Sequence, residues 1–162
     1  MNHRPLTESR ITTKSAAETN PLHIALIEPQ LVDILVHIWH LRVYIRNRRS
    51  ADKDSWWDHV IINDVYGIDQ AIAKWTPTHA PGSLQYPASM LYKQAVWIYF
   101  NRTIQPSRPS AAFKQVVDDG LHYLKALPPD QSALLMPLTL LGIAAFDDVQ
   151  RAHVQVLSLI HI

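Results

Sequence analysis

Residues 31–45 read LVDILVHIWHLRVYI, and the apolar positions in this stretch indicate the fold class. They recur every three or four residues, which is the spacing of one face of an α-helix and not of a β-strand. The apolar stripe consists of Leu31, Ile34, Leu35, Ile38, Leu41 and Ile45, and it is followed toward the end by Arg42, Arg46, Arg48 and Arg49. Positive charge suits the carboxyl end of a helix dipole. We therefore predict a long amphipathic helix here.

The same spacing returns along the rest of the chain, where prolines separate the apolar segments. A second helix is predicted from Asp54-Ser55 to Trp75, with Asp58 three residues after Ser55 in an arrangement like a capping box. Further helices are predicted at 88–103, 111–127, 131–146 and 149–162, with Ser110 and Asp130 as N-caps. Strand-like alternation is hardly visible. The prediction is an all-α array of about six helices with proline-marked loops.

Two features of this array predict close packing. Residues 131–146 are apolar almost all round, which is typical of a helix buried at the centre of a domain. Gly120 lies inside the fourth predicted helix, where glycine is an unfavourable residue unless a neighbour needs the space. We expect Gly120 to lie against a close neighbour.

Composition limits the classes of function. The chain has 162 residues, of which 48% are hydrophobic and 18% charged, so it can form one domain with a core. It has no cysteine, which excludes disulfides, thiolate nucleophiles and cysteine-bound zinc. A formal net charge of +1 provides no overall field to hold nucleic acid or an anionic membrane. No apolar segment reaches the roughly 20 residues of a membrane-spanning helix.

Polar clusters offer two candidate sites, and an ordinary structural role is favoured for both. His37 and His40, with Asp33 one turn before His37, have a spacing that can place metal ligands on one face. The carboxylate and the later ligand of a zinc-peptidase helix are missing. Asp118-Asp119 and Asp147-Asp148 are paired acids, but adjacent helical residues point apart. We predict no metal, cofactor or catalytic residue in this chain.

Arginines and tryptophans form two further patterns. The run Arg46-Asn47-Arg48-Arg49 is a candidate phosphate-contacting or nuclear-import patch, although a basic helix end is the ordinary explanation. Core packing is predicted for most of the tryptophans, which are Trp39, Trp56, Trp57, Trp75 and Trp97. A pocket lined by residues such as Trp39, Trp75 and Trp97 is the alternative. Motifs of the common enzyme classes, such as a glycine-rich phosphate loop, are absent.

Residues 133–145 read ALLMPLTLLGIAA, and an acidic-to-arginine segment follows at 147–151. This stretch resembles the fungal-specific transcription factor domain, the regulatory region that follows the zinc-cluster DNA-binding module in many fungal activators. Residues 64–77, 92–102 and 106–128 are similar to further segments of that family in the expected order. The resemblance extends from about Pro21 to Arg151.

The resemblance implies a nuclear, helical regulatory domain that acts through protein partners, self-association or a small-molecule effector, without membrane contact. The cysteine-rich zinc module is absent, so specific DNA binding by this chain is not expected. We expect a disordered leader at residues 1–20 and a partial regulatory domain at residues 21–162, since family members usually continue through further helices. A small helical enzyme or small-molecule binder, and a gene fragment with an exposed apolar face, are the alternatives.

Overall fold

The computed structural model describes residues 27–51, 58–106, 108–129 and 132–161, and in these ranges it contains helices and no strand. The helices are α1 (Pro29–Ser50), α2 (His59–Lys74), α3 (Gln85–Ile104), α4 (Ala111–Lys125), α5 (Leu135–Ala144) and α6 (Asp148–His161). A 3-10 turn, η1 (Ser132–Leu134), precedes α5. The predicted all-α array of six helices is therefore confirmed. The predicted leader at residues 1–20 lies outside the described residues.

Short polar side chains cap the N-termini of the later helices. The Ser110 hydroxyl accepts a hydrogen bond from the backbone N–H of Phe113 at 3.2 Å, so it caps α4 as predicted. At the start of α6, the Asp147 carboxylate accepts one from the N–H of Val149 at 2.7 Å. Asp130, the cap predicted for the fifth helix, lies outside the described residues.

Asp58 corrects the predicted start of the second helix. It does not lie inside the helix, because its backbone is extended and its own carboxylate caps α2 by accepting the Val60 N–H at 2.9 Å. Its Oδ2 atom also accepts a hydrogen bond from the Tyr44 hydroxyl at 3.0 Å and pairs with Arg48 at 2.8 Å. The Val60 N–H, the Tyr44 hydroxyl and the Arg48 charge hold the pKa of Asp58 below its ordinary value. Residues 54–57 lie outside the described residues.

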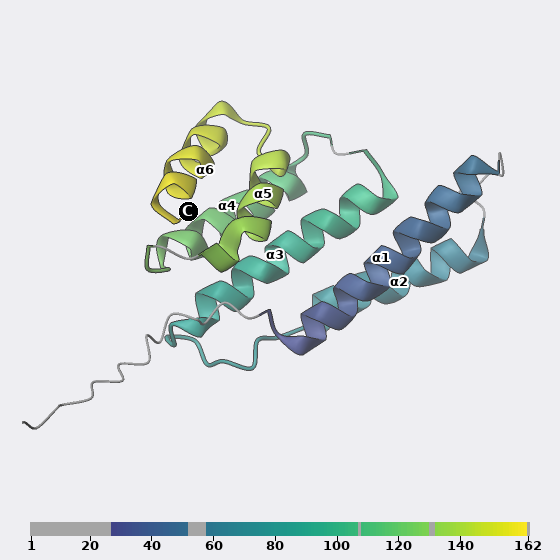
Figure 1. The fold of residues 1–162 in the computed structure, drawn as a ribbon, viewed down its shortest axis with the longest axis horizontal. Helices are drawn as coiled ribbons and strands as arrows, with labels where there is room; N and C mark the ends of the chain where they lie inside the picture. The colour runs from purple at the N-terminus through teal and green to yellow at the C-terminus, as the bar shows by residue number, and fades with distance from the viewer. Residues whose placement is uncertain (1–26, 52–57, 107, 130–131, 162) are drawn as a thin grey trace, which may run out of the picture.

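The central helix is α3. Figure 1 shows it between the antiparallel pair α1 and α2 on one side and the group α4, α5 and α6 on the other, and it packs against α1, α2, α4 and α5. The prediction that residues 131–146 form the buried central helix is wrong. That segment forms the short η1 and α5, which leave Leu135 57% exposed and Ile143 44% exposed. Only one side of α5 is covered by the core.

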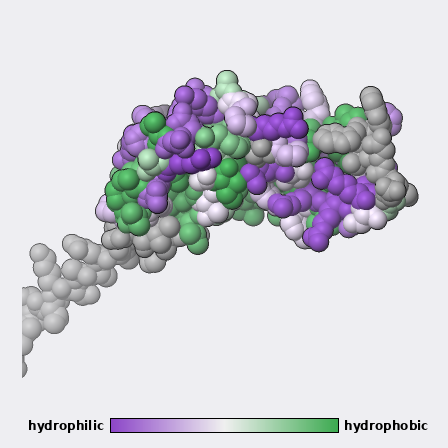
Figure 2. Space-filling view, turned by 90° about the horizontal axis from the view of Figure 1, so that it is seen from above, coloured by the Kyte–Doolittle hydropathy of each residue, from purple (hydrophilic) through white to green (hydrophobic). Residues whose placement is uncertain are grey.

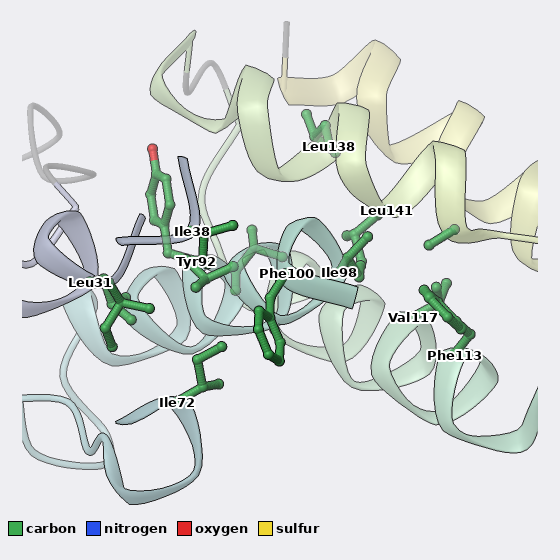
Figure 3. Packing of buried hydrophobic residues seen from close by; sticks show 14 of the residues in the cluster. Leu31, Ile38, Ile72, Tyr92, Ile98, Phe100, Phe113, Val117, Leu138 and Leu141 are labelled. Atoms are coloured by element: carbon green, nitrogen blue, oxygen red, sulfur yellow. The ribbon is translucent and has the colours of Figure 1, made fainter. Parts of the chain in front are cut away.

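The core brings α5 against α3 and α4. In Figure 3, Leu141 of α5 lies close to Ile98 of α3, with Phe113 and Val117 of α4 beside them. A β-carbon added to Gly120 would lie only 2.5 Å from Cδ2 of Leu141, so the predicted close neighbour is confirmed. Because Leu141 is fully buried, its side chain has little space into which it can move.

A buried carboxylate anchors the start of α1. Glu28 directly precedes α1 and is only 6% exposed. Its Oε2 atom accepts a hydrogen bond from the backbone N–H of Thr78 at 3.1 Å, and its Oε1 atom accepts one from the Ser89 hydroxyl at 2.6 Å. Thr78 belongs to the segment between α2 and α3, and Ser89 belongs to α3. Glu28 and Asp58 therefore fix the two halves of α1 to its neighbours.

Candidate functional site

An apolar groove of about 490 Å³ lies between α1, α3 and α5. Its lining residues are Leu35, Tyr99, Leu135, Met136, Thr139 and Leu140. Both α1 and α5 pack on α3, and α3 contributes Tyr99 to the lining of the groove. The volume is in the range of pockets that bind small molecules or hold the anchoring side chains of a partner. This groove is the candidate functional site.

The groove is apolar because α5 carries apolar residues on the side that does not face the core. Leu138 and Leu141 are buried, whereas Leu135 is exposed and Leu140 is half-buried in the groove wall. The Thr139 hydroxyl donates to the Leu135 carbonyl at 2.8 Å within α5. Tyr99 and Thr139 are the two lining residues with a polar side-chain group, and the Thr139 hydroxyl already has a partner within α5.

A cation lies over the ring of Tyr99. The Arg42 guanidinium carbon lies 5.5 Å from the centre of the Tyr99 ring, which is within the range of a cation–π contact. Arg42 follows Leu35 by two helical turns, so both residues lie on the groove side of α1. The groove therefore has an apolar lining, and the Arg42 charge contacts one of its lining residues.

A second apolar surface lies on α1 beside the groove. It consists of Val32, Val36, Trp39 and Val43, which are 38%, 45%, 54% and 37% exposed, and we call it the outer stripe. The other side of α1 carries the predicted stripe, of which every member is buried except Leu35, which is half-buried and lines the groove. Because α1 is apolar on two sides, its outer stripe is available for a partner.

Exposed apolar residues also occur on α6. They are Val149, Val156, Leu159 and Ile160, with Leu159 the most exposed at 82%. Figure 2 shows hydrophobic residues on the surface over the half of the molecule that contains α4, α5 and α6, and also near the middle of the view. The molecule therefore has several apolar surfaces, and the groove is a concave one.

His37 and His40 lie together in a cleft of about 240 Å³ between α1 and α2. Asn63, Asp64 and Gly67 of α2 form much of its opposite wall. Among the residues that the structure describes, no three histidine, aspartate or glutamate side chains are arranged to hold a metal ion. The absence of a metal site in this chain stays a prediction.

The adjacent acids bind separate partners. Asp118 accepts a hydrogen bond from Nε2 of Gln150 at 2.7 Å, which joins α4 to α6. Asp119 accepts one from Nε2 of Gln115 at 2.7 Å within α4. The two carboxylates thus act as separate structural groups, which agrees with the interpretation that adjacent helical residues point apart.

The tryptophans do not share one pocket. Trp39 belongs to the outer stripe, whereas Trp75 is 5% exposed and lies beneath Lys93, whose Nζ atom is 5.7 Å from the ring centre. Trp97 packs edge to face on Phe113 at 5.2 Å. The predicted alternative was one pocket lined by these three tryptophans. The lining of the groove contains none of them. Trp56 and Trp57 lie outside the described residues.

Comparison with known proteins identifies the family. The family model of the fungal specific transcription factor domain matches residues 12–159. No curated protein and no solved structure matches the chain. In the described ranges, no helix has both the length and the apolar character needed to cross a membrane. Since the family match covers nearly the whole chain and the structure is all-α, this chain belongs to the fungal specific transcription factor domain family.

Proposed function

We propose that this chain is a regulatory domain of a fungal transcription regulator that acts in the nucleus through protein contacts made by the α1–α3–α5 groove. Family membership supports the role in transcription. The observation that carries the contact role is the groove itself, which is concave, apolar and flanked by the exposed side chain of Leu135. Concave apolar surfaces with few polar groups are the usual sites of partner anchoring.

The charge distribution supports regulation without sequence-specific DNA binding. The chain carries a formal charge of only +1, and nucleic-acid binding depends strongly on clustered positive charge. Within the arginine run of α1, Arg48 is already paired with Asp58 at 2.8 Å. We therefore propose that another part of the regulator, or another protein, reads the DNA.

A tethering assay tests this function. The full chain is fused to an unrelated DNA-binding domain, and expression of a reporter with the matching sites is measured in a fungal host. We expect reporter expression to change relative to the DNA-binding domain alone, and Leu140→Glu to abolish most of that change, because a charge in the groove opposes apolar docking. Leu159→Glu on α6 is the matched control and should leave the effect intact.

Two results would overturn the proposal. One is an inert fusion that is nevertheless expressed and folded; the other is sequence-selective DNA binding by the unfused chain at physiological salt. Equal loss of activity in Leu140→Glu and Leu159→Glu would remove the groove from the proposal, because α6 would then be as important.

A small apolar effector is the second candidate function, which the volume of about 490 Å³ and the apolar lining of the groove favour. An apolar molecule with one anionic group would also match the Arg42 charge. Native mass spectrometry of the chain purified from a fungal host should then show a stoichiometric small-molecule adduct. Leu140→Glu should lose this adduct and Leu159→Glu should keep it. Protein without any adduct, from cells in which the tethered chain is active, would count against an effector.

A further inference from the structure

We propose that the outer stripe of α1 pairs with the same stripe of a second copy in antiparallel orientation, so that the domain forms a two-fold dimer. This inference goes beyond the proposed function, since it concerns a different surface and a regulatory domain can act as a monomer. In Figure 1, α1 lies in front of α2 at the side of the molecule away from α6.

The spacing of the stripe is self-complementary. Val32, Val36, Trp39 and Val43 are separated by four, three and four residues, which reads the same in both directions. In a two-fold contact, residue i meets residue j and residue j meets residue i. With the axis between His37 and Ile38, Val32 meets Val43 of the second copy and Val36 meets Trp39. Each large indole then packs against a smaller valine, as interdigitating helices require.

The flanks of the stripe agree with this orientation. Asp33 and His40 are exposed and lie on the same flank of α1. A two-fold axis brings like flanks together, and it leaves Asp33 of one copy about 3 Å along the helix axis from His40 of the other. With so small an axial offset the two side chains face each other, and an imidazole N–H can donate to a carboxylate. One donor and one acceptor therefore face each other twice in the dimer.

The arginines of the two copies stay apart in the antiparallel pair. Arg42 and Arg46 are exposed on the other flank, and the two-fold axis of the antiparallel pair brings this flank of one copy beside the same flank of the other. In the antiparallel pair, the two Arg42 side chains are about 13 Å apart along the axis, and the two Arg46 side chains are further apart still. This separation exceeds the screening length of about 8 Å at physiological salt. Repulsion between these arginines is therefore small in the antiparallel pair.

The size of the surface sets the expected affinity. The outer stripe consists of four exposed side chains, and the groove, whose lining includes Leu35 of α1, lies beside it. One helix pair is smaller than the roughly 800 Å² per partner of a standard stable interface. We therefore expect a dissociation constant on the order of micromolar, which is typical of small interfaces.

Cysteine cross-linking tests the register directly, because the full chain has no cysteine of its own. Val32→Cys is mixed with Val43→Cys under mild oxidation, and the disulfide-linked dimer is measured on a non-reducing gel. The two thiols meet in the proposed dimer, so the mixture should give about tenfold more product than either variant alone. In Val32→Cys alone, the two thiols are about 16 Å apart along the axis.

Ala152→Cys on α6 is the matched control, since this residue is exposed on a different apolar surface. Efficient cross-linking of Val32→Cys with itself would show a parallel pair and would overturn the proposal. Equal yields from every variant, Ala152→Cys included, would show random collision and would overturn it as well.

Sedimentation equilibrium gives an independent measurement. The native chain should be partly dimeric at about 50 µM, in keeping with a micromolar interface. Trp39→Glu should be monomeric, because it would bury two uncompensated charges near the axis. Leu159→Glu should keep the native dimer, and circular dichroism should show native helix content in both variants. A monomeric native chain, or a dimer that Trp39→Glu leaves intact, contradicts the pairing and leaves the groove proposal untouched.

Discussion

Ile98→Ala is expected to lower the free energy of unfolding by about 4 kcal/mol, as for other fully buried isoleucines. Ile98 is 0% exposed on α3, the helix that contacts α1, α2, α4 and α5. The truncation removes three methyl or methylene groups at a position where the surrounding side chains come from several helices and cannot all move inward. Urea unfolding followed by circular dichroism measures the change.

Ile143→Ala is the matched control on α5. Ile143 is 44% exposed, so the same truncation should cost less than about 1 kcal/mol, because surface substitutions have small effects. Comparing the two variants tests whether α3 or α5 is the central helix. If Ile143→Ala destabilised the chain as much as Ile98→Ala does, α5 would be as buried as its sequence pattern predicts, and the assignment of α3 would be wrong.

Gly120→Val is expected to cost about 3 kcal/mol, which is the upper part of the range for overpacking. The new β-carbon would lie 2.5 Å from Cδ2 of Leu141, and the two γ-methyl groups would add further overlap. The gain in helix propensity over glycine is smaller than this, since it is below about 1 kcal/mol. The measurement is again the free energy of unfolding in urea.

A double-mutant cycle shows whether the contact with Leu141 is the cause. Leu141→Ala alone should cost about 3 kcal/mol through the cavity that it leaves. In the double variant, the valine at 120 occupies part of that cavity, so the combined loss should be smaller than the sum of the single losses by about 2 kcal/mol. Simple additivity of the two losses would show that Gly120 is needed for some reason other than the space of Leu141.

Much of the fold was predictable from local patterns. The buried stripe of α1 could be predicted because its apolar residues recur every three or four positions. This spacing places them on one side of a helix, and that apolar side is buried in the core. Ser110 could be assigned as a cap because its hydroxyl satisfies a free N–H group that every helix start presents. Gly120 was informative because glycine inside a helix needs a compensating contact.

The position of α5 could not be predicted in the same way. A segment that is apolar all round gives no direction, so its pattern cannot distinguish Leu138 and Leu141, which are buried, from Leu135, which is exposed. The start of α2 was missed for a related reason. Ser55 and Asp58 are both good capping residues, and the contacts that Asp58 makes with Tyr44 and Arg48 belong to the tertiary structure.

The groove was missed because its residues come from three helices that are distant in the sequence. Tyr99 and Leu140 belong to different apolar segments, and nothing local shows that α1 and α5 leave a gap over α3. The outer stripe was detectable in principle. Val32, Val36, Trp39 and Val43 repeat at helical spacing within the same fifteen residues as the buried stripe, and this surplus of apolar residues indicates a second covered face.

The anchoring of α1 by Glu28 and Asp58 has a consequence for recognition. A helix secured near both ends loses little additional entropy when a partner binds, because its orientation and backbone have already been restricted during folding. Both the outer stripe and the α1 wall of the groove are carried on this preorganised helix. Substituting Glu28 would therefore weaken association from a distance, by letting α1 sample orientations in which its apolar faces no longer match a partner.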